Sequence, residues 1–269
     1  MVKTRPAAVA GVFYPADGNA LRRDVHSFLD AAKPSTPKDK ASIKALVVPH
    51  AGFMYSGPVA ASAYRLLSGR EGVRRVVLLG PTHRVPVAGL AVPDCGAFAT
   101  PLGNIPLDTT AMATLTPLHQ VMVSNSAHAW EHSIEVQLPF LQEVLGEFSL
   151  VPLAVGDTSA KEVAEVLEVV WGGDETLVVV SSDLSHYLTY EAAQAVDTRT
   201  AELVLTLRHE DLDHNRACGA APLSGLLEVA RRKGLTARLV DLRNSGDTEG
   251  DRERVVGYGA FVFTRTLEG

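Results

Sequence analysis

The hydrophobic positions of this chain fall into short continuous runs that alternate with longer amphipathic stretches. The runs are rich in Val and Leu, and some of them, such as Leu177–Val180, contain no polar residue. Such a strand is typical of a sheet that helices cover on both faces. The expected strands are Ala45–Val48, Val76–Leu79, Leu90–Val92, Leu150–Leu153, Leu177–Val180, Arg238–Leu242 and Val255–Phe263.

The amphipathic stretches predict helices between these strands. They are Ala20–Ala32, Val59–Leu67, Ser133–Leu145, Ala160–Val170, Glu191–Leu207 and Leu223–Lys233. This alternation predicts an α/β fold, in the form of a three-layer αβα sandwich around a largely parallel or mixed sheet. The polar segment Lys33–Ser42 is expected to be a loop. Because the sequence shows no internal repeat or low-complexity tract, residues 1–269 are expected to form a single domain.

Composition and charge exclude several classes of protein. The 269 residues are 46% hydrophobic and 21% charged, which is ordinary for a globular protein. The net charge of -6 argues against nucleic acid as a partner, because phosphate binding needs a concentrated basic surface. No apolar run approaches the roughly 18 residues of a membrane span, and the N-terminus lacks the apolar core of a signal peptide. With only two cysteines and no disulfide framework, the protein is expected to be cytoplasmic.

Side chains that can bind metals or transfer protons follow several of the expected strands. His50, His83, Asp183, His186 and Asp247 each lie within a few residues of a strand's carboxyl end. In an open α/β sheet, ligands bind outside this edge. A surface or capping position would explain any one of these residues, but independent surface positions have no reason to gather at one edge. The sequence therefore predicts a shared site.

The stretch "HAWEHSIEVQLPF", residues 128–140, leaves two interpretations open. His132 and Glu135 are three residues apart and would meet on a helix surface, so an amphipathic helix that Pro139 kinks or ends explains the pattern. Alternatively, His132 lies at the helix start and points into the shared cleft. Cys218 is expected to be a small buried cysteine rather than a nucleophile.

Two histidines and a carboxylate form a typical ligand set for a transition metal. With vacant positions, this set suits non-haem Fe(II). Zinc hydrolases use the same residue types, so residue types do not select the metal. If His50, His83 and Asp247 are the ligands, His186 is free to transfer protons, with its ring oriented by Asp183 or a neighbour.

Six segments resemble, in order along the chain, the signature blocks of the Memo family. They are "RPAAVAGVFYPADGNALRRDVHSFL", "PHAGFMYSG", "LGPTHRVP", "EHSIEVQLPFL", "VVSSDLSHY" and "ACGAAPLSG". The bacterial and archaeal members are named component B of the AmmeMemoRadiSam system. The resemblance implies a fold similar to the class III extradiol dioxygenases, the LigB-like enzymes. Those enzymes hold Fe(II) with two histidines and a glutamate and use another histidine as acid/base.

The resemblance also implies roles for individual residues. His50 and His83 match the two metal histidines, His186 matches the acid/base, and His132 falls in a block that the family places in the pocket. Asp247 is the nearest equivalent of a cysteine that some eukaryotic members carry. Because a carboxylate favours Fe(II) over Cu(I), Fe(II) is the expected cofactor, with copper or zinc as alternatives.

Three functions are open at this point. The first is a metal-dependent oxidoreductase of extradiol type, with Asp183, His132 and His186 as catalytic residues. Its nominated substrate-binding residues are Phe53, Tyr55, Tyr187 and Arg84. The second is an adaptor protein whose vestigial cleft binds a small molecule or peptide. The third is an enzyme that works beside a radical-SAM enzyme and an Ammecr-like protein, as the family's bacterial name implies.

Overall fold

The computed structural model describes residues 3–32 and 43–265, and the loop expected at Lys33–Ser42 lies outside them. The middle layer is a mixed sheet with the strand order β10-β12-β2-β9-β3-β8-β4-β7, in which β11 also pairs with β12. Its centre consists of four parallel strands, β2 (Ile43–Val48), β9 (Thr176–Ser181), β3 (Arg75–Pro81) and β8 (Ser149–Val155).

The other strands extend this sheet or form a second, smaller one. β12 (Val255–Arg265) runs antiparallel to β2, and β11 (Leu235–Asn244) and β10 (His186–Leu188) run antiparallel to β12. At the opposite edge lie β4 (Leu90–Val92) and β7 (Val121–Val123). The small sheet contains β1 (Thr4–Arg5), β5 (Ala97–Thr100) and β6 (Gly103–Pro106).

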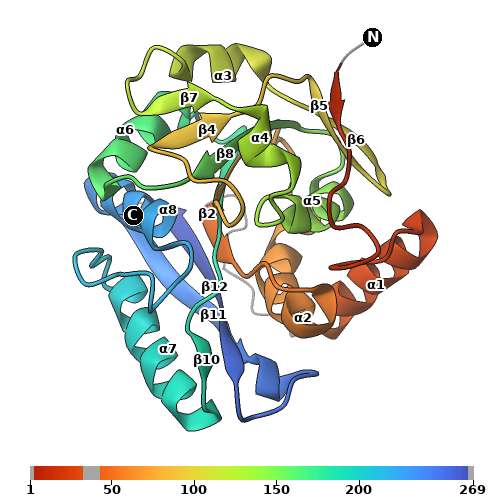
Figure 1. Cartoon of the computed structure of the whole chain (residues 1–269), viewed down its shortest axis with the longest axis vertical. Helices are drawn as coiled ribbons and strands as arrows, with labels where there is room; N and C mark the ends of the chain where they lie inside the picture. The colour runs from red at the N-terminus through yellow and green to blue at the C-terminus, as the bar shows by residue number, and fades with distance from the viewer. Residues whose placement is uncertain (1–2, 33–42, 266–269) are drawn as a thin grey trace.

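Helices cover both faces of the large sheet (Figure 1). One layer contains α1 (Gly18–Ala31), α2 (Phe53–Tyr64) and α5 (Leu138–Leu145), and the other contains α6 (Ala160–Val170), α7 (Tyr190–Leu205) and α8 (Ala220–Arg232). Shorter elements are α3 (Thr109–Leu115), α4 (Asn125–Ala129) and the 3-10 helices η2 (Arg65–Leu67), η3 (Glu135–Gln137) and η4 (Ser245–Asp247). The predicted three-layer αβα sandwich around a mixed sheet is confirmed.

Burial explains why the central strands read as continuous apolar runs. Every residue of β2 and of β9 is buried, because helices pack on both faces of these strands. All the expected strands are present, as are the expected helices other than the one over Ser133–Leu145. Most boundaries are shifted, but β4 and α6 have the predicted bounds. The short strands β1, β5, β6, β7 and β10 and the helices α3 and α4 were not predicted, since so few residues cannot display a hydrophobic period.

The segment before α5 differs from the single helix expected over Ser133–Leu145. The chain instead forms η3 and then α5, with Pro139 in the first turn of α5. Proline fits there because the first turn of a helix needs no N–H donor from it. Pro139 therefore helps to begin a helix rather than to kink or end one, and His132 lies in a loop ahead of it.

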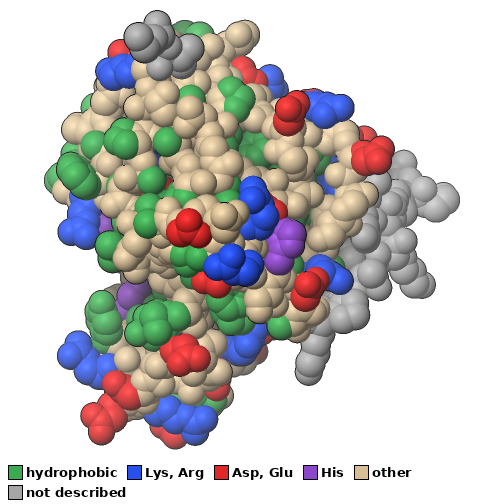
Figure 2. Space-filling view, turned by 90° about the vertical axis from the view of Figure 1, so that its right-hand side faces the viewer, with side chains coloured by type: hydrophobic (Ala, Val, Ile, Leu, Met, Phe, Trp, Pro, Cys, Tyr) green, Lys and Arg blue, Asp and Glu red, His purple; other side chains and the backbone are tan. Residues whose placement is uncertain are grey.

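Two further observations concern the surface. In the part of the chain that the structure describes, no helix combines the length and apolarity that crossing a membrane requires. On the face shown in Figure 2, acidic and basic side chains are interspersed rather than gathered into one patch of a single sign.

Candidate metal centre

Three histidines from separate segments converge at the carboxyl edge of the sheet. β2, β9 and β3 are neighbouring parallel strands, so their carboxyl ends lie side by side, and His50 and His83 follow the ends of β2 and β3. His132 joins them from the loop between α4 and η3. One ligand atom from each imidazole lies within 4.8 Å of the others. That spacing is close to what one ion needs, since nitrogens bound to an ion at about 2.1 Å lie at most about 4.2 Å apart.

A glycine in β3 lets the loop of His132 approach the sheet. A Cβ at Gly80 would lie 2.5 Å from Ser133 Oγ, so a larger residue there would push this loop away. The Ser133 hydroxyl donates to the backbone carbonyl of Pro81 at 2.8 Å, which ties the loop to the end of β3. His132 then stacks on His83, with 4.6 Å between the ring centroids.

Ser181, the last residue of β9, determines which nitrogen of His50 faces the cleft. Its hydroxyl donates to the carbonyl of Ser133 at 2.6 Å and accepts from Gln137 Nε2 at 2.7 Å. With its only proton already donated, the hydroxyl accepts from His50 Nδ1 at 2.9 Å. Nδ1 therefore carries the proton, and Nε2 keeps a lone pair. Burial, together with the neighbouring His83, lowers the pKa of His50 to about 3, so this imidazole is neutral at physiological pH.

Glu131 orients the other two imidazoles, as Ser181 orients His50. Its Oε1 lies 2.9 Å from His83 Nδ1 and 3.4 Å from His132 Nδ1. Burial alone would raise the pKa of Glu131, but hydrogen bonds from His83 and from backbone N–H groups bring it down to about 2. The ionised carboxylate can only accept, so His83 Nδ1 carries the proton and Nε2 is left for a ligand. Burial lowers the pKa of His132 to about 4, with a contribution from His50.

These imidazoles fit a divalent transition metal. His50 and His83 donate from Nδ1 to Ser181 and Glu131, and His132 Nδ1 lies 3.4 Å from Glu131. This leaves Nε2 as the ligand atom, as is usual for metal-bound histidine. Imidazole donors suit zinc, copper, iron and nickel. The residues that would hold the ion are His50, His83 and His132.

Asp183 and His186 lie beside the three histidines. The buried Asp183 Oδ1 accepts from the backbone N–H of His50 at 2.7 Å, and burial raises the pKa of this carboxyl. His186 Nδ1 donates to the carbonyl of Leu184 at 2.8 Å. The ring of His186 is therefore oriented by its own backbone and not by Asp183, and Nε2 is its free nitrogen.

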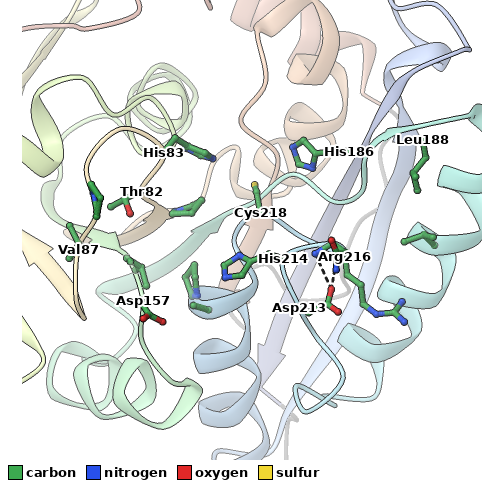
Figure 3. A pocket seen from close by; sticks show the side chains of 18 residues that line it. Thr82, His83, Val87, Asp157, His186, Leu188, Asp213, His214, Arg216 and Cys218 are labelled. Carbon is green, nitrogen blue, oxygen red and sulfur yellow. Dashed lines mark hydrogen bonds between the residues drawn. The ribbon is translucent and has the colours of Figure 1, made fainter.

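Two cavities meet at this cluster. One, of about 540 Å³, is lined by all three histidines together with Asp183, His186, Tyr55 and Tyr187. The other, of about 940 Å³, shares His83 and His186 with the first and continues past Val87, Asp157 and the segment before α8. In Figure 3, His83 and His186 stand on either side of this second cavity, with Cys218 and His214 between them. A bound molecule could therefore contact the histidines from two sides.

The structure does not bring Asp247 into the cluster. The third residue beside His50 and His83 is His132, whose position the sequence had left open. Asp247 is exposed in η4, where its Oδ2 accepts from the backbone N–H of Asn244 at 3.0 Å. Its Oδ1 accepts from Tyr190 Oη at 2.5 Å. The side chains of Asn244 and Asp247 cap each other's backbone, so both carboxylate oxygens of Asp247 are engaged outside the histidine cluster.

The nominated substrate-binding residues divide into two pairs. Tyr55 and Tyr187 line the smaller cavity. Phe53 instead belongs to the core, where its ring centroid lies 5.0 Å from that of Phe140, and Arg84 is exposed and lines neither cavity. The guanidinium that does reach the smaller cavity is that of Arg254, which lies over the ring of Tyr187 at 5.1 Å.

Sequence reasoning missed three residues of this site. Glu131 and Ser181 were not singled out, although Glu131 directly precedes His132 and Ser181 lies two residues before Asp183. Cys218 was expected to be inert, yet its Sγ lies 3.3 Å from His50 Nε2. Burial raises the pKa of Cys218, so it is a neutral thiol that can donate to the His50 lone pair. Apart from Glu131 and His132, which are consecutive, no spacing along the sequence relates these residues to their imidazole partners.

Comparison with known proteins agrees with the fold and with the segments quoted from the sequence. Residues 5–262 match the sequence pattern of the family described as Memo-like protein. A MEMO1 family protein of Methanopyrus kandleri is 37% identical, over 97% of this chain and 99% of that protein. A MEMO1 family protein of Aquifex aeolicus is 34% identical, over 97% and 100%.

A solved structure shares the fold. The crystal structure of an uncharacterized protein of Escherichia coli K12 superposes with a TM-score of 0.58 and 12% sequence identity. The match covers 82% of this chain and 99% of that protein. From the extent of the family match and the identity to its members, this chain belongs to the Memo family.

Proposed function

We propose that this protein is a metal-dependent enzyme in which His50, His83 and His132 hold one divalent transition-metal ion. The proposal rests on one observation, the convergence of three imidazoles whose Nδ1 atoms face Ser181 and Glu131. A bound ion would supply Lewis-acid activation and, if it is iron, access to dioxygen chemistry. Fe(II) is the first metal to test because the family resembles the extradiol dioxygenases. Zinc and copper accept the same donors.

The groups beside the histidines give the site its capacity for proton transfer. Because His186 Nδ1 donates to Leu184, Nε2 is the nitrogen that the ring presents to both cavities. Asp183 lines the smaller cavity and, with its raised pKa, keeps a proton at a higher pH than an exposed carboxyl. We assign His186 Nε2 to the removal of a proton from the substrate and to its later return, with the Asp183 carboxyl beside it in the smaller cavity. Tyr55 and Tyr187 supply aromatic surface for a small molecule.

Oxygen uptake tests the oxidoreductase part of this proposal. Protein loaded anaerobically with Fe(II) is mixed with catechol in air-saturated buffer, and oxygen is followed with an electrode. Wild type should consume oxygen in step with catechol, while His186→Gln should bind iron normally and lose most of the rate. Iron-loaded wild type that consumes no oxygen above the level of free Fe(II) would refute extradiol-type activity on this probe.

A second candidate is a binding protein that uses the cleft without catalysis. Apolar side chains are exposed next to residues that line the smaller cavity, with Val12 80% and Met54 57% exposed. Such side chains are common where a protein binds a peptide or another protein. This candidate would replace the first if folded wild type retained neither iron nor zinc.

A further inference from the structure

We infer that Glu131 is a positioning residue that makes His83 and His132 present Nε2 to the cleft. The inference rests on the proposed metal centre, since Nε2 is the ligand atom there. It can be tested separately, because Glu131 acts on the metal-free protein. Glu131 is only 2% exposed and follows α4, where no sequence motif for metal binding marks it.

The contacts of Glu131 fix its orientation on both sides. Oε2 accepts from the backbone N–H of His83 at 2.6 Å. Oε1 accepts from the backbone N–H groups of His132 and Ser133, both at 2.9 Å, and from His83 Nδ1 at 2.9 Å. His132 Nδ1 lies 3.4 Å from the same oxygen. In the described part of the chain, no other acceptor approaches either Nδ1. This carboxylate therefore fixes the proton of His83 on Nδ1 through a hydrogen bond, and it is the acceptor nearest to Nδ1 of His132.

The charge of Glu131 also suits a bound cation. A buried carboxylate is costly unless it is paired. The nearby guanidinium of Arg5 forms its ion pair with Glu135, and its hydrogen bond to Glu131 is to the backbone carbonyl, not to the carboxylate. No guanidinium or ammonium of the described residues therefore pairs with the Glu131 carboxylate, whose charge is met by backbone N–H groups and by His83 and would also favour a cation bound to the imidazoles. A carboxylate behind metal-bound histidines typically strengthens metal binding 10- to 100-fold.

Glu135 offers a matched control four residues further along the chain. It is as deeply buried as Glu131, with an exposed fraction of 0%. Its carboxylate accepts from Arg5, from the backbone N–H groups of Ala8 and Val9, and from Tyr14 Oη. It contacts none of the three histidines, so its loss should weaken the fold without changing how the imidazoles are oriented.

Nuclear magnetic resonance can observe the orientation directly. In metal-free protein with ¹⁵N-labelled histidine, two-bond ¹H–¹⁵N correlations distinguish an Nδ1–H ring from an Nε2–H ring, and His83→Asn and His132→Asn assign the signals. Wild type and Glu135→Gln should show both rings as Nδ1–H. Glu131→Gln should shift His83, and with it His132, toward Nε2–H, because an amide offers an acceptor at only one of the two oxygen positions.

Zinc affinity, measured by competition with a chelator dye, gives the second readout. Glu131→Gln should bind zinc about 10- to 100-fold more weakly than wild type, and Glu135→Gln within about threefold of it. Glu131→Asp keeps the negative charge but moves it away from the imidazoles, so its zinc affinity should lie between those of the other two variants. It replaces Glu131→Gln in the test if that variant does not fold.

Three outcomes are decisive for this role of Glu131. Wild-type His83 found as Nε2–H, or a Glu131→Gln variant with unchanged rings and unchanged zinc affinity, would overturn it. Rings that shift as expected in a protein that binds no zinc would uphold the positioning role and refute the metal centre of the proposed function.

Discussion

Replacing Ser181 with alanine removes the group that orients His50. The Ser181 hydroxyl is fully buried, accepts from His50 Nδ1 and Gln137 Nε2, and donates to the carbonyl of Ser133. Without it, His50 Nδ1–H loses its acceptor, whereas Gln137 Nε2 still donates to the carbonyl of Pro49 at 2.8 Å. The change therefore leaves one buried donor without a partner and weakens the bonding of two further groups.

The magnitude follows from these contacts. An unsatisfied buried donor costs about 1–3 kcal/mol, and the weakened Gln137 and Ser133 contacts add about 1 kcal/mol. We expect the free energy of unfolding to fall by about 2–4 kcal/mol. For a domain of this size, that lowers the melting temperature by roughly 4–15 °C. Because the His50 ring is then free to place its proton on Nε2, zinc affinity should fall about 10- to 100-fold.

Differential scanning calorimetry of metal-free protein measures the first effect, and competition titration with zinc measures the second. The matched control is Ser182→Ala, the next residue, whose buried hydroxyl donates to the carbonyl of Asp183 and accepts from the backbone N–H of Gly219. It should destabilise the fold to a similar extent and change zinc affinity less than about threefold. If Ser181→Ala bound zinc as tightly as Ser182→Ala, the orienting role of Ser181 would be refuted.

Two further predictions concern a thiol and a pH dependence. Cys218→Ala removes the donor that faces His50 Nε2 in the metal-free protein, so zinc should bind about two- to fivefold more tightly; a tenfold loss would instead make Cys218 a ligand. Burial lowers the pKa of His128 to about 4, while the unfolded chain takes up that proton near pH 6.5, so stability should fall as the pH drops from about 6.5 toward 4. The melting temperature of His128→Gln should therefore fall less between pH 7 and pH 5 than that of wild type, and equal slopes would contradict this reasoning.

The sequence predicted the central fold because its information is local. A strand such as Leu177–Val180 is apolar throughout since it is covered on both faces, and this is visible without knowing its partners. His50 and His83 were predicted for a related reason. Both follow central parallel strands directly, so the end of the strand determines where the side chain begins.

Asp247 shows where this reasoning stops. β11 ends at the same edge of the sheet as β2, but β12 lies between them, so strand spacing alone separates the two ends by about 10 Å. The loop after β11 does reach the smaller cavity, through Ser245 and Asp251. Asp247 itself is engaged in capping η4, which its neighbours in sequence did not reveal.

Glu131 and Ser181 could not be found from sequence patterns for another reason. Glu131 contacts His83 across 48 residues, and Ser181 contacts His50 across 131. Only the packing of β9 and of the loop before η3 against the ends of β2 and β3 creates these pairs. The sequence left the position of His132 open for the same reason. Because α5 begins only at Leu138, His132 lies in the preceding loop, where its side chain can reach the cleft.

Metal content is the most direct test of the three-histidine centre. The experiment compares wild type with four variants, His50→Ala, His83→Ala, His132→Ala and Asp247→Ala. Each protein is loaded anaerobically with Fe(II) or Zn(II), freed of excess metal and checked for fold by circular dichroism. Its metal content is then measured by inductively coupled plasma mass spectrometry. We expect about one ion per chain in wild type and in Asp247→Ala, and little in the three histidine variants. Folded His132→Ala that keeps its metal, together with Asp247→Ala that loses it, would contradict the centre described here.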